Sequence, residues 1–470
     1  MGKRRRAPQA PIKRAEESLS SPTNVAPAGV DASAIRRPAK TLAETTLTCD
    51  LLPLKSGDRR WQDLSAGRGG EATLALRRRF LRQPASSWLH VAFASHRGAG
   101  KTSELHRLAK ELEQRYFCIY LESNVELDPY TIDGDDLLMV LARAVESTMR
   151  EARMALPREL LEKVANWFAD ITESKGWLER ATLDFGTGAE ASAQVPFFAK
   201  LFAKLTTLLK HESERRRQVK STLRQYPGTL LDSVNAVLDA AAAVLRKRGK
   251  ELLVILDNLD RYPPKVIDEL LVQGADRIAN LHCYLILTPP ISLIYRPESE
   301  LIETRFPCEL MNAVKLRDPA GSYQKPIDPG RDLMLSALAL RVDLARLIPE
   351  EATRERIIAA SGGAIRDCIE YVQEASLLAS GEYLDMADVD RVLVRRVQRL
   401  RDRINANGWH NVLERIARTK QLSADPMCLD VLYHRLVLKY NEAGWYDIHP
   451  LVAEVPEIRD RLHDIETIAR

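Results

Sequence analysis

Apolar residues gather in five short runs along the chain, separated by longer stretches with helical periodicity. Each run is nearly continuous in hydrophobic residues, which is typical of strands buried on both faces of a parallel sheet. The stretches between the runs repeat apolar residues at spacings of three and four, as amphipathic helices do. The pattern therefore predicts an α/β fold, a parallel sheet covered by helices. The five predicted strands are 89–94, 117–121, 252–256, 283–288 and 310–316.

The order of these runs divides the chain into four parts. Residues 1–45 are rich in Pro, Ala and Ser and predict a disordered basic tail. Residues 46–320 hold all five predicted strands and are longer than strand–helix units of ~30 residues require. A large helical insertion is therefore expected at about 130–225. Residues 321–403 predict a helical lid, and 404–470 a small C-terminal domain.

Charge is distributed unevenly along the chain. Residues 1–40 carry nine Lys or Arg and three Asp or Glu, a net +6, although the whole chain carries +4. The tail therefore fits a contact with nucleic acid or anionic lipid, or a solvated leader. No segment reaches the ~18 apolar residues of a membrane-spanning helix, and no secretory signal is visible. Six scattered cysteines without a Cys-x-x-Cys pair fit a reducing compartment, so a cytoplasmic location is expected.

A phosphate-binding motif follows the first apolar run. The motif reads Ser95-His96-Arg97-Gly98-Ala99-Gly100-Lys101-Thr102-Ser103. It lies between a predicted strand and a predicted helix, which is the setting that a P-loop requires. Backbone N–H groups of this loop would surround a phosphate, and Gly98 and Gly100 let the backbone approach without a Cβ clash. One departure from the usual pattern is Ser95, which stands where the motif normally begins with Gly.

Three side chains near this loop predict a site for ATP and Mg²⁺. The Lys101 ammonium would neutralise the β- and γ-phosphate oxygens, and the Thr102 hydroxyl would bind Mg²⁺. The run at 252–256 ends in Asp257. A carboxylate at the carboxyl end of a parallel strand lies beside the P-loop, so Asp257 is the second predicted Mg²⁺ ligand.

The two motifs resemble the Walker A and Walker B motifs of the AAA+ and STAND branch of P-loop ATPases. The string that carries this likeness, similar to Asp-Asp-Leu-Asp-Arg in KAP and NACHT-like members, is Asp257-Asn258-Leu259-Asp260-Arg261. Many AAA+ relatives carry a water-activating Glu at the position of Asn258, which cannot accept a proton. Asp260 is either a substitute base or a structural acid paired with Arg261. The resemblance implies ATP hydrolysis, and this departure implies that hydrolysis is slow.

The same resemblance, which covers about residues 50–400, implies further site residues. Thr288, at the end of the fourth run, matches the sensor-1 position or else opens the turn that follows. The segment 361–367 resembles the sensor-2 segment of an AAA+ lid, in which Arg366 reaches phosphate, unless it is a surface arginine. An arginine from a neighbouring subunit completes such sites, and Arg305 and Arg317 are the candidates.

A second and weaker resemblance concerns the chain after residue 385. Replication-initiation ATPases of the AAA+ class place a winged helix after the lid. Predicted helices at 411–418 and 428–439, followed by a short strand at 445–448, fit such a domain. The helix before them carries arginines on more than one face, which fits either DNA contact or a solvated surface.

The resemblances imply an ATPase that acts as a nucleotide-controlled assembly switch, a homo-oligomer in bacterial regulation or anti-phage defence. The alternative is a DNA-binding initiator or loader whose C-terminal domain and basic tail bind duplex. A protein partner has two expected docking places, the C-terminal domain and the helical insertion. The segment 197–217 of the insertion is amphipathic, which fits a helix that packs on its own domain or one that docks on a partner or a membrane surface. The insertion lacks the length and apolarity of a KAP-like membrane segment.

Overall fold

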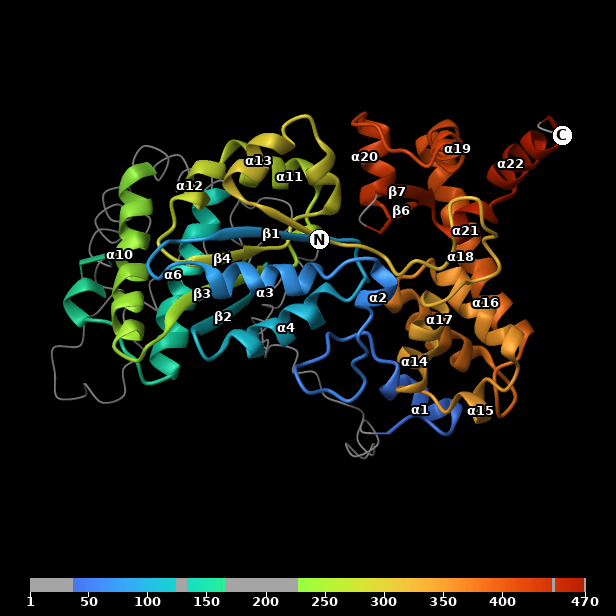
Figure 1. Cartoon of the computed structure of the whole chain (residues 1–470), viewed down its shortest axis with the longest axis horizontal. Coiled ribbons are helices and arrows are strands. Elements are labelled where there is room, and N and C mark those ends of the chain that lie inside the picture. Colours follow the sequence, from blue (N-terminus) through green and yellow to red (C-terminus); the bar gives the residue numbers. More distant parts are fainter. Residues whose placement is uncertain (1–36, 124–132, 162, 165–226, 442–443, 469–470) are drawn as a thin grey trace, which may run out of the picture.

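A five-stranded parallel sheet lies at the centre of the fold, with strand order β2-β3-β4-β1-β5. The computed structural model describes residues 37–123, 133–161, 163–164, 227–441 and 444–468. The strands are β1 (His90–Ser95), β2 (Tyr116–Glu122), β3 (Glu251–Asp257), β4 (Tyr284–Leu287) and β5 (Cys308–Met311). The predicted α/β fold with a parallel sheet is confirmed (Figure 1).

Helices cover both faces of this sheet (Figure 1). They are α3 (Ala72–Arg82), α4 (Lys101–Leu112), α6 (Gly134–Glu151), α10 (Pro227–Arg246), α11 (Pro264–Asp268), α12 (Ala275–Ala279) and α13 (Ser299–Arg305), with short turns at Leu259–Arg261, Glu269–Gln273 and Ile291–Tyr295. Ala92 and Val254 face α6 and α10, whereas Phe93 and Ile255 face α3 and α4. Because both faces are covered, β1, β3 and β4 are buried throughout, which explains their continuous apolar runs.

A set of helices follows the sheet in the chain. They are α14 (Gly330–Ala339), α15 (Leu344–Leu347), α16 (Glu351–Ser361), α17 (Ile365–Leu378) and α18 (Met386–Asn407). The N-terminal helix α1 (Leu42–Thr48) packs on α17, and the backbone N–H of buried Ala39 donates to Arg341 O at 2.8 Å. Residues 39–45, which were expected to belong to a disordered tail, are therefore folded.

The C-terminal residues build a separate hydrophobic core. Their elements are α19 (His410–Thr419), α20 (Pro426–Tyr433), the antiparallel pair β6 (Val437–Tyr440) and β7 (Trp445–Ile448), α21 (Pro450–Ala453) and α22 (Pro456–Ile468). The predicted helix 428–439 is wrong beyond Tyr433. Arg435 has a left-handed φ of +61°, which ends α20 and directs the chain into β6.

The fifth predicted strand, 310–316, is only partly right because β5 ends at Met311. The next residues leave the sheet: the N–H of Ala313 donates to Lys439 O at 3.3 Å, and that of Val314 to Gly363 O at 3.1 Å. Ala313 and Val314 are buried against the C-terminal domain and the lid. An apolar run is the same whether the burying partner is a sheet or another domain, so the pattern could not separate the two.

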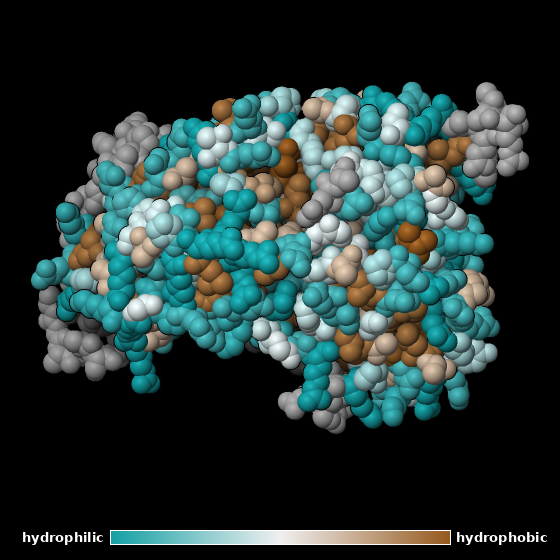
Figure 2. All heavy atoms as spheres, viewed as in Figure 1, coloured by the Kyte–Doolittle hydropathy of each residue, from teal (hydrophilic) through white to brown (hydrophobic). Residues whose placement is uncertain are grey.

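Of the helical insertion expected at about 130–225, only residues 133–161 and 163–164 are described. Helix α6 agrees with the helical pattern at its start, whereas the amphipathic segment 197–217 lies outside the described residues. Among the described helices, none is both long and apolar enough to cross a membrane. The face drawn in Figure 2 is mostly hydrophilic, with scattered apolar patches.

Candidate nucleotide-binding site

The predicted phosphate-binding motif forms the loop between β1 and α4. Gly98 and Gly100 have left-handed φ values of +82° and +96°, conformations that favour glycine. Gly100 directly precedes α4, and no side chain caps the first N–H groups of that helix. Uncapped N–H groups and the positive end of the helix dipole attract an anion. The loop therefore has the features that phosphate binding requires.

Lys101, the first residue of α4, is buried and forms an ion pair with Asp260. The Lys101 Nζ atom lies 2.6 Å from Asp260 Oδ2, and both side chains are less than a tenth exposed. The Asp260 carbonyl oxygen accepts a hydrogen bond of 2.9 Å from Arg97 Nε. The sequence left two roles open for Asp260, a base or an ion-pair partner of Arg261. In the structure the ion-pair partner of Asp260 is Lys101.

Asp257 closes β3 and accepts hydrogen bonds on both carboxylate oxygens. Thr288 Oγ1 donates to Oδ1 at 2.9 Å, and the Asn258 N–H donates to the same oxygen at 2.7 Å. The Tyr120 hydroxyl donates to Oδ2 at 2.5 Å. Burial alone would raise the pKa of Asp257, but the charge of Lys101 and these hydrogen bonds lower it. Asp257 is therefore a carboxylate anion at neutral pH.

The residues around Asp257 fit a magnesium ion. Thr102 lies close enough to the Asp257 side chain to help lower its pKa, so the two predicted ligands lie near each other. Hydroxyl and carboxylate oxygens are the ligands that Mg²⁺ takes, and it usually adds waters and substrate phosphates to only one or two carboxylates. Across the described part of the chain, no group of three or more His, Cys, Asp or Glu is placed to hold a metal. When bound, the ion would supply positive charge to the phosphate oxygens.

Asn258 occupies the position at which many AAA+ relatives carry a catalytic Glu. Its backbone is left-handed with a φ of +67°, a conformation that Asn tolerates better than most residues. The residue is buried, and it lines the cleft beside the loop. Its amide cannot accept a proton, so the candidate base is Asp260, two residues further on.

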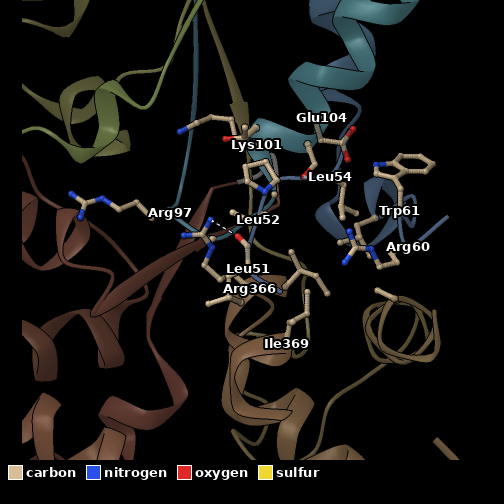
Figure 3. A pocket seen from close by; sticks show the side chains of 18 of the residues that line it. Leu51, Leu52, Leu54, Arg60, Trp61, Arg97, Lys101, Glu104, Arg366 and Ile369 are labelled. Carbon is tan, nitrogen blue, oxygen red and sulfur yellow. Dashed lines mark hydrogen bonds between the residues drawn. The ribbon is translucent and has the colours of Figure 1, made fainter. Parts of the chain in front are cut away.

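Arg366 enters the cleft from the start of α17, as the sensor-2 resemblance implies. Its backbone N–H donates to Gly98 O at 3.0 Å, and its Nη2 donates to Leu51 O at 3.4 Å (Figure 3). Burial lowers the pKa of Arg366, and the neighbouring Arg261 and Arg435 add to this shift. A guanidinium nevertheless stays charged in proteins, so the lid places a cation beside the phosphate-binding loop.

One wall of the cleft was not predicted from the sequence. The lead-in segment 51–54 and Trp61 line the cleft together with Ile365 and Ile369 of α17 (Figure 3). This wall is mostly apolar, whereas the floor carries the charged side chains around Lys101. An apolar wall beside a phosphate-binding floor suits a nucleobase.

Ion pairs and stacking hold this lead-in in place. Arg60 pairs with Asp50 at 2.5 Å and with Asp58 at 2.9 Å. The Arg107 guanidinium lies 4.4 Å from the centre of the Trp61 ring. The Ser103 Oγ atom, in the first turn of α4, accepts the N–H of Leu54 at 2.9 Å. The wall is thus tied to the helix that begins at the phosphate-binding loop.

Other residues singled out in the sequence do not line the cleft. Ser95 and Ala99 are buried beneath the loop, and the Ala99 carbonyl accepts a 2.6 Å hydrogen bond from Arg68 Nη2. Arg305 pairs with Asp276 outside the cleft at 2.6 Å. Arg317 is buried, with its guanidinium 3.7 Å from the centre of the Tyr323 ring. This burial leaves Arg317 in no position to reach a neighbouring subunit.

The phosphate-binding loop also contacts the C-terminal domain. The Nε2 atom of buried His96 accepts the N–H of Lys439 in β6 at 2.8 Å. Arg97 lies over the ring of Tyr433 in α20, 4.4 Å from its centre. Burial, aided by neighbouring cations, lowers the pKa of His96 to about 3, so the ring is neutral and acts as an acceptor. The loop and the C-terminal domain therefore share a buried hydrogen bond.

We expect His96→Ala to lower the free energy of unfolding by about 1–3 kcal/mol at pH 7.5, because the Lys439 N–H loses its buried acceptor. This deficit should shrink in acid. The folded pKa of about 3 lies below the ordinary value of 6.5, so only the unfolded state takes up the proton between these values. Wild-type protein therefore loses about 1.4 kcal/mol per pH unit below 6.5 through this ring, and the variant does not.

Urea denaturation at pH 7.5 and pH 5 measures both effects. The deficit of His96→Ala is expected to be about 2 kcal/mol smaller at pH 5 than at pH 7.5. His282→Ala is the control, because His282 is exposed and pairs with the exposed Asp239. An equal deficit at both pH values would contradict a neutral, buried His96 ring.

The sheet and its loop define the class of fold. A strand from the middle of a parallel sheet runs into a glycine-containing loop and an uncapped helix, and β3, which β4 separates from that strand, brings Asp257 to the same edge. This arrangement is that of the P-loop NTPase α/β fold. The fold class that the sequence predicts is confirmed.

Comparisons with known proteins return fold neighbours only. No protein-family model matches the chain, and no curated protein matches its sequence. A Walker-type ATPase of Pyrococcus abyssi is 15% identical, with a TM-score of 0.41 over 87% of this chain and 99% of that one. Two Aeropyrum pernix proteins are each 12% identical to this chain. ORC2, in ADPNP-ADP complexes, has a TM-score of 0.37 over 84% of this chain and 94% of its own. ORC1, in complex with DNA, has a TM-score of 0.36 over 85% of this chain and 93% of its own.

Proposed function

We propose that the chain binds Mg²⁺·ATP in the cleft between sheet and lid and hydrolyses it slowly, as an AAA+-type ATPase. The observation that carries the proposal is that Lys101 and Arg366 line one cleft beside a glycine-containing loop, and that the charge of Lys101 acts on the buried Asp257. Lys101 and the start of α4 would hold the β- and γ-phosphates, Asp257 and Thr102 would hold Mg²⁺, and the apolar wall would hold the base. Arg366 would add positive charge from the lid.

The same contacts supply a reason for slow hydrolysis. Asn258 cannot act as a base, and the carboxylate of Asp260 is engaged by Lys101. Phosphate oxygens would compete for Lys101 and release Asp260, which then could take the proton of the attacking water. Asp260 therefore has two opposed effects: it competes with ATP for the lysine, and it serves as the base once ATP is bound.

The finer proposal is that the nucleotide state controls assembly of a homo-oligomer. Two features support it: the Asp257–Arg261 string, with its likeness to STAND ATPases, and the hydrogen bond between His96 and the C-terminal domain. A slowly hydrolysed ATP state persists long enough to be read by a partner. A role in bacterial regulation or anti-phage defence follows from the resemblance.

A second candidate function, a DNA-binding initiator or loader, is favoured by the order of elements in the C-terminal domain. Helices α19 and α20 are followed by the antiparallel hairpin β6–β7, the helix–helix–hairpin order of a winged helix. This domain touches the phosphate-binding loop through His96, so nucleotide could gate its contact with duplex.

Equilibrium ATP binding with and without Mg²⁺, together with phosphate release, tests the proposed function. Absence of Mg²⁺-dependent ATP binding would reject it. Light-scattering mass at micromolar protein, with a non-hydrolysable analogue, tests assembly, and strictly monomeric protein with intact turnover would reject the switch. A DNA shift assay tests the second candidate, for which affinity should fall steeply with added salt.

Asp260→Asn is expected to bind ATP about tenfold more tightly, because Lys101 no longer has a competing anionic partner, a change worth about 1.5 kcal/mol. The same variant should hydrolyse ATP at least about 100-fold more slowly, because the candidate base is lost. ATP titration and single-turnover phosphate release separate these effects. Asp276→Asn, in an exposed ion pair outside the cleft, is the control. Unchanged turnover in Asp260→Asn would exclude Asp260 as the base.

A further inference from the structure

Tyr120 lies beside the candidate Mg²⁺ site on β2, a strand to which the sequence assigned no site residue. In the register of β2 and β3, Tyr120 lies opposite Ile255, two residues before Asp257. Its hydroxyl nevertheless reaches Asp257 and donates to Oδ2 at 2.5 Å. A tyrosine hydroxyl ordinarily has a pKa of about 10, so it is protonated at neutral pH and is the donor in this hydrogen bond.

The hydrogen bond from Tyr120 gives the second oxygen of the Asp257 carboxylate a donor. Thr288 and the Asn258 N–H donate to Oδ1, whereas the Tyr120 hydroxyl donates to Oδ2. A carboxylate held at only one oxygen can rotate about its last bond. Donors on both oxygens therefore set the plane of the carboxylate that faces Thr102.

The ring of Tyr120 is itself held by the helix that carries Thr102. His106, one turn after Thr102 on α4, stacks on Tyr120 with ring centres 4.4 Å apart and planes at 26°. Residues four apart on a helix lie on the same face. The stack thus links the two candidate Mg²⁺ ligands, one on α4 and one at the end of β3, through a single side chain.

We propose that Tyr120 is a positioning residue for the magnesium ion of this site: its hydroxyl orients the Asp257 carboxylate toward Thr102, so that the pair presents its oxygens to the ion. This inference rests on the proposed function, because it presumes that Mg²⁺·ATP is the ligand. Partners that orient metal ligands commonly contribute 10- to 100-fold to metal affinity. Tyr120 acts through Asp257 and does not touch the phosphates.

Tyr120→Phe tests this role, because it removes the hydroxyl and keeps the ring that stacks on His106. A non-hydrolysable ATP analogue is titrated at a series of Mg²⁺ concentrations, and the Mg²⁺ concentration giving half-maximal tight binding is read. We expect this concentration to rise 10- to 100-fold in the variant. Binding of the analogue in EDTA should stay as in wild type, since the loop and Lys101 are unchanged.

Tyr116→Phe is the matched control on the same strand. Tyr116 is buried, and its hydroxyl donates to Phe80 O at 2.7 Å, far from the carboxylate. Both variants lose a buried hydrogen bond and so lose stability, but only Tyr120→Phe should change the Mg²⁺ requirement. His106→Ala is a second probe, expected to raise the requirement in the same direction by removing the stack.

Two negative results have different meanings. If wild-type protein shows no Mg²⁺-dependent binding of the analogue, the proposed function itself fails. If wild type shows it and Tyr120→Phe has the same Mg²⁺ requirement, the positioning role is overturned and the hydroxyl is structural. Should Tyr120→Phe not fold, an unchanged Mg²⁺ requirement in folded His106→Ala overturns the role equally.

Discussion

Lys101→Ala is expected to lose tight ATP binding, with affinity falling roughly 10- to 150-fold. Hydrogen bonds to charged groups contribute about 1.5–3 kcal/mol net, and the lysine would meet two phosphates. Lys101 is 5% exposed, so bulk water does not replace its charge. The loss should be larger than that of one hydrogen bond, because Asp260 remains behind as an unpaired anion facing the phosphates. Isothermal titration with Mg²⁺·ATP measures the affinity.

Two further variants separate the phosphate contact from the ion pair. Lys110→Ala removes a lysine of the same helix, exposed and paired with Glu113, and should bind ATP as wild type does. Lys101→Ala should also lower the free energy of unfolding, because it leaves a buried unpaired anion. The double variant Lys101→Ala/Asp260→Asn removes that anion and should regain much of this folding stability. It should not regain wild-type ATP affinity, because the lysine charge is still missing. Wild-type affinity in Lys101→Ala would refute the assignment of the loop.

The sheet could be predicted from the sequence because its strands are buried on both faces. Continuous apolar runs mark β1, β3 and β4 within one or two residues of their bounds. Prediction failed where another domain covers an apolar run, and where the chain turns without a glycine to signal the turn. Val314 follows β5 and is covered by the lid, and the segment 434–436 reverses direction at Arg435, whose left-handed backbone has no glycine to signal it.

The floor of the site could be predicted for a similar reason. Lys101, Thr102, Asp257 and Thr288 all follow strands or begin the helix after β1, and the carboxyl ends of parallel strands meet at one edge. The apolar wall could not be predicted, because the lead-in 51–54 has no regular structure of its own. Tertiary ion pairs and the stacking of Trp61 bring it to the cleft, and no local pattern encodes them.

Gly363→Ala is the second substitution for which we expect a large effect. Gly363 lies between α16 and α17 with a left-handed φ of +83°, and its carbonyl accepts the Val314 N–H at 3.1 Å. A Cβ at this position would lie 1.9 Å from Val314 O, a backbone atom that cannot move alone. The left-handed backbone costs about 1–2 kcal/mol for a residue with a Cβ, and overpacking adds about 1–3 kcal/mol. We expect the free energy of unfolding to fall by about 2–5 kcal/mol.

Gly57→Ala isolates the steric part of this effect. Gly57 has nearly the same φ, +84°, but a Cβ there meets no atom within 4 Å, so only the backbone term of about 1–2 kcal/mol remains. Urea denaturation of the two variants compares them directly. Gly363→Ala should also weaken ATP binding, because Arg366 follows three residues later and its N–H is bonded to Gly98 O. Equal destabilisation by the two substitutions would mean that the lid does not need close backbone contact with the chain after β5. The position of Arg366 in the cleft would then depend on its own contacts, the backbone hydrogen bond to Gly98 O and the side-chain bond to Leu51 O.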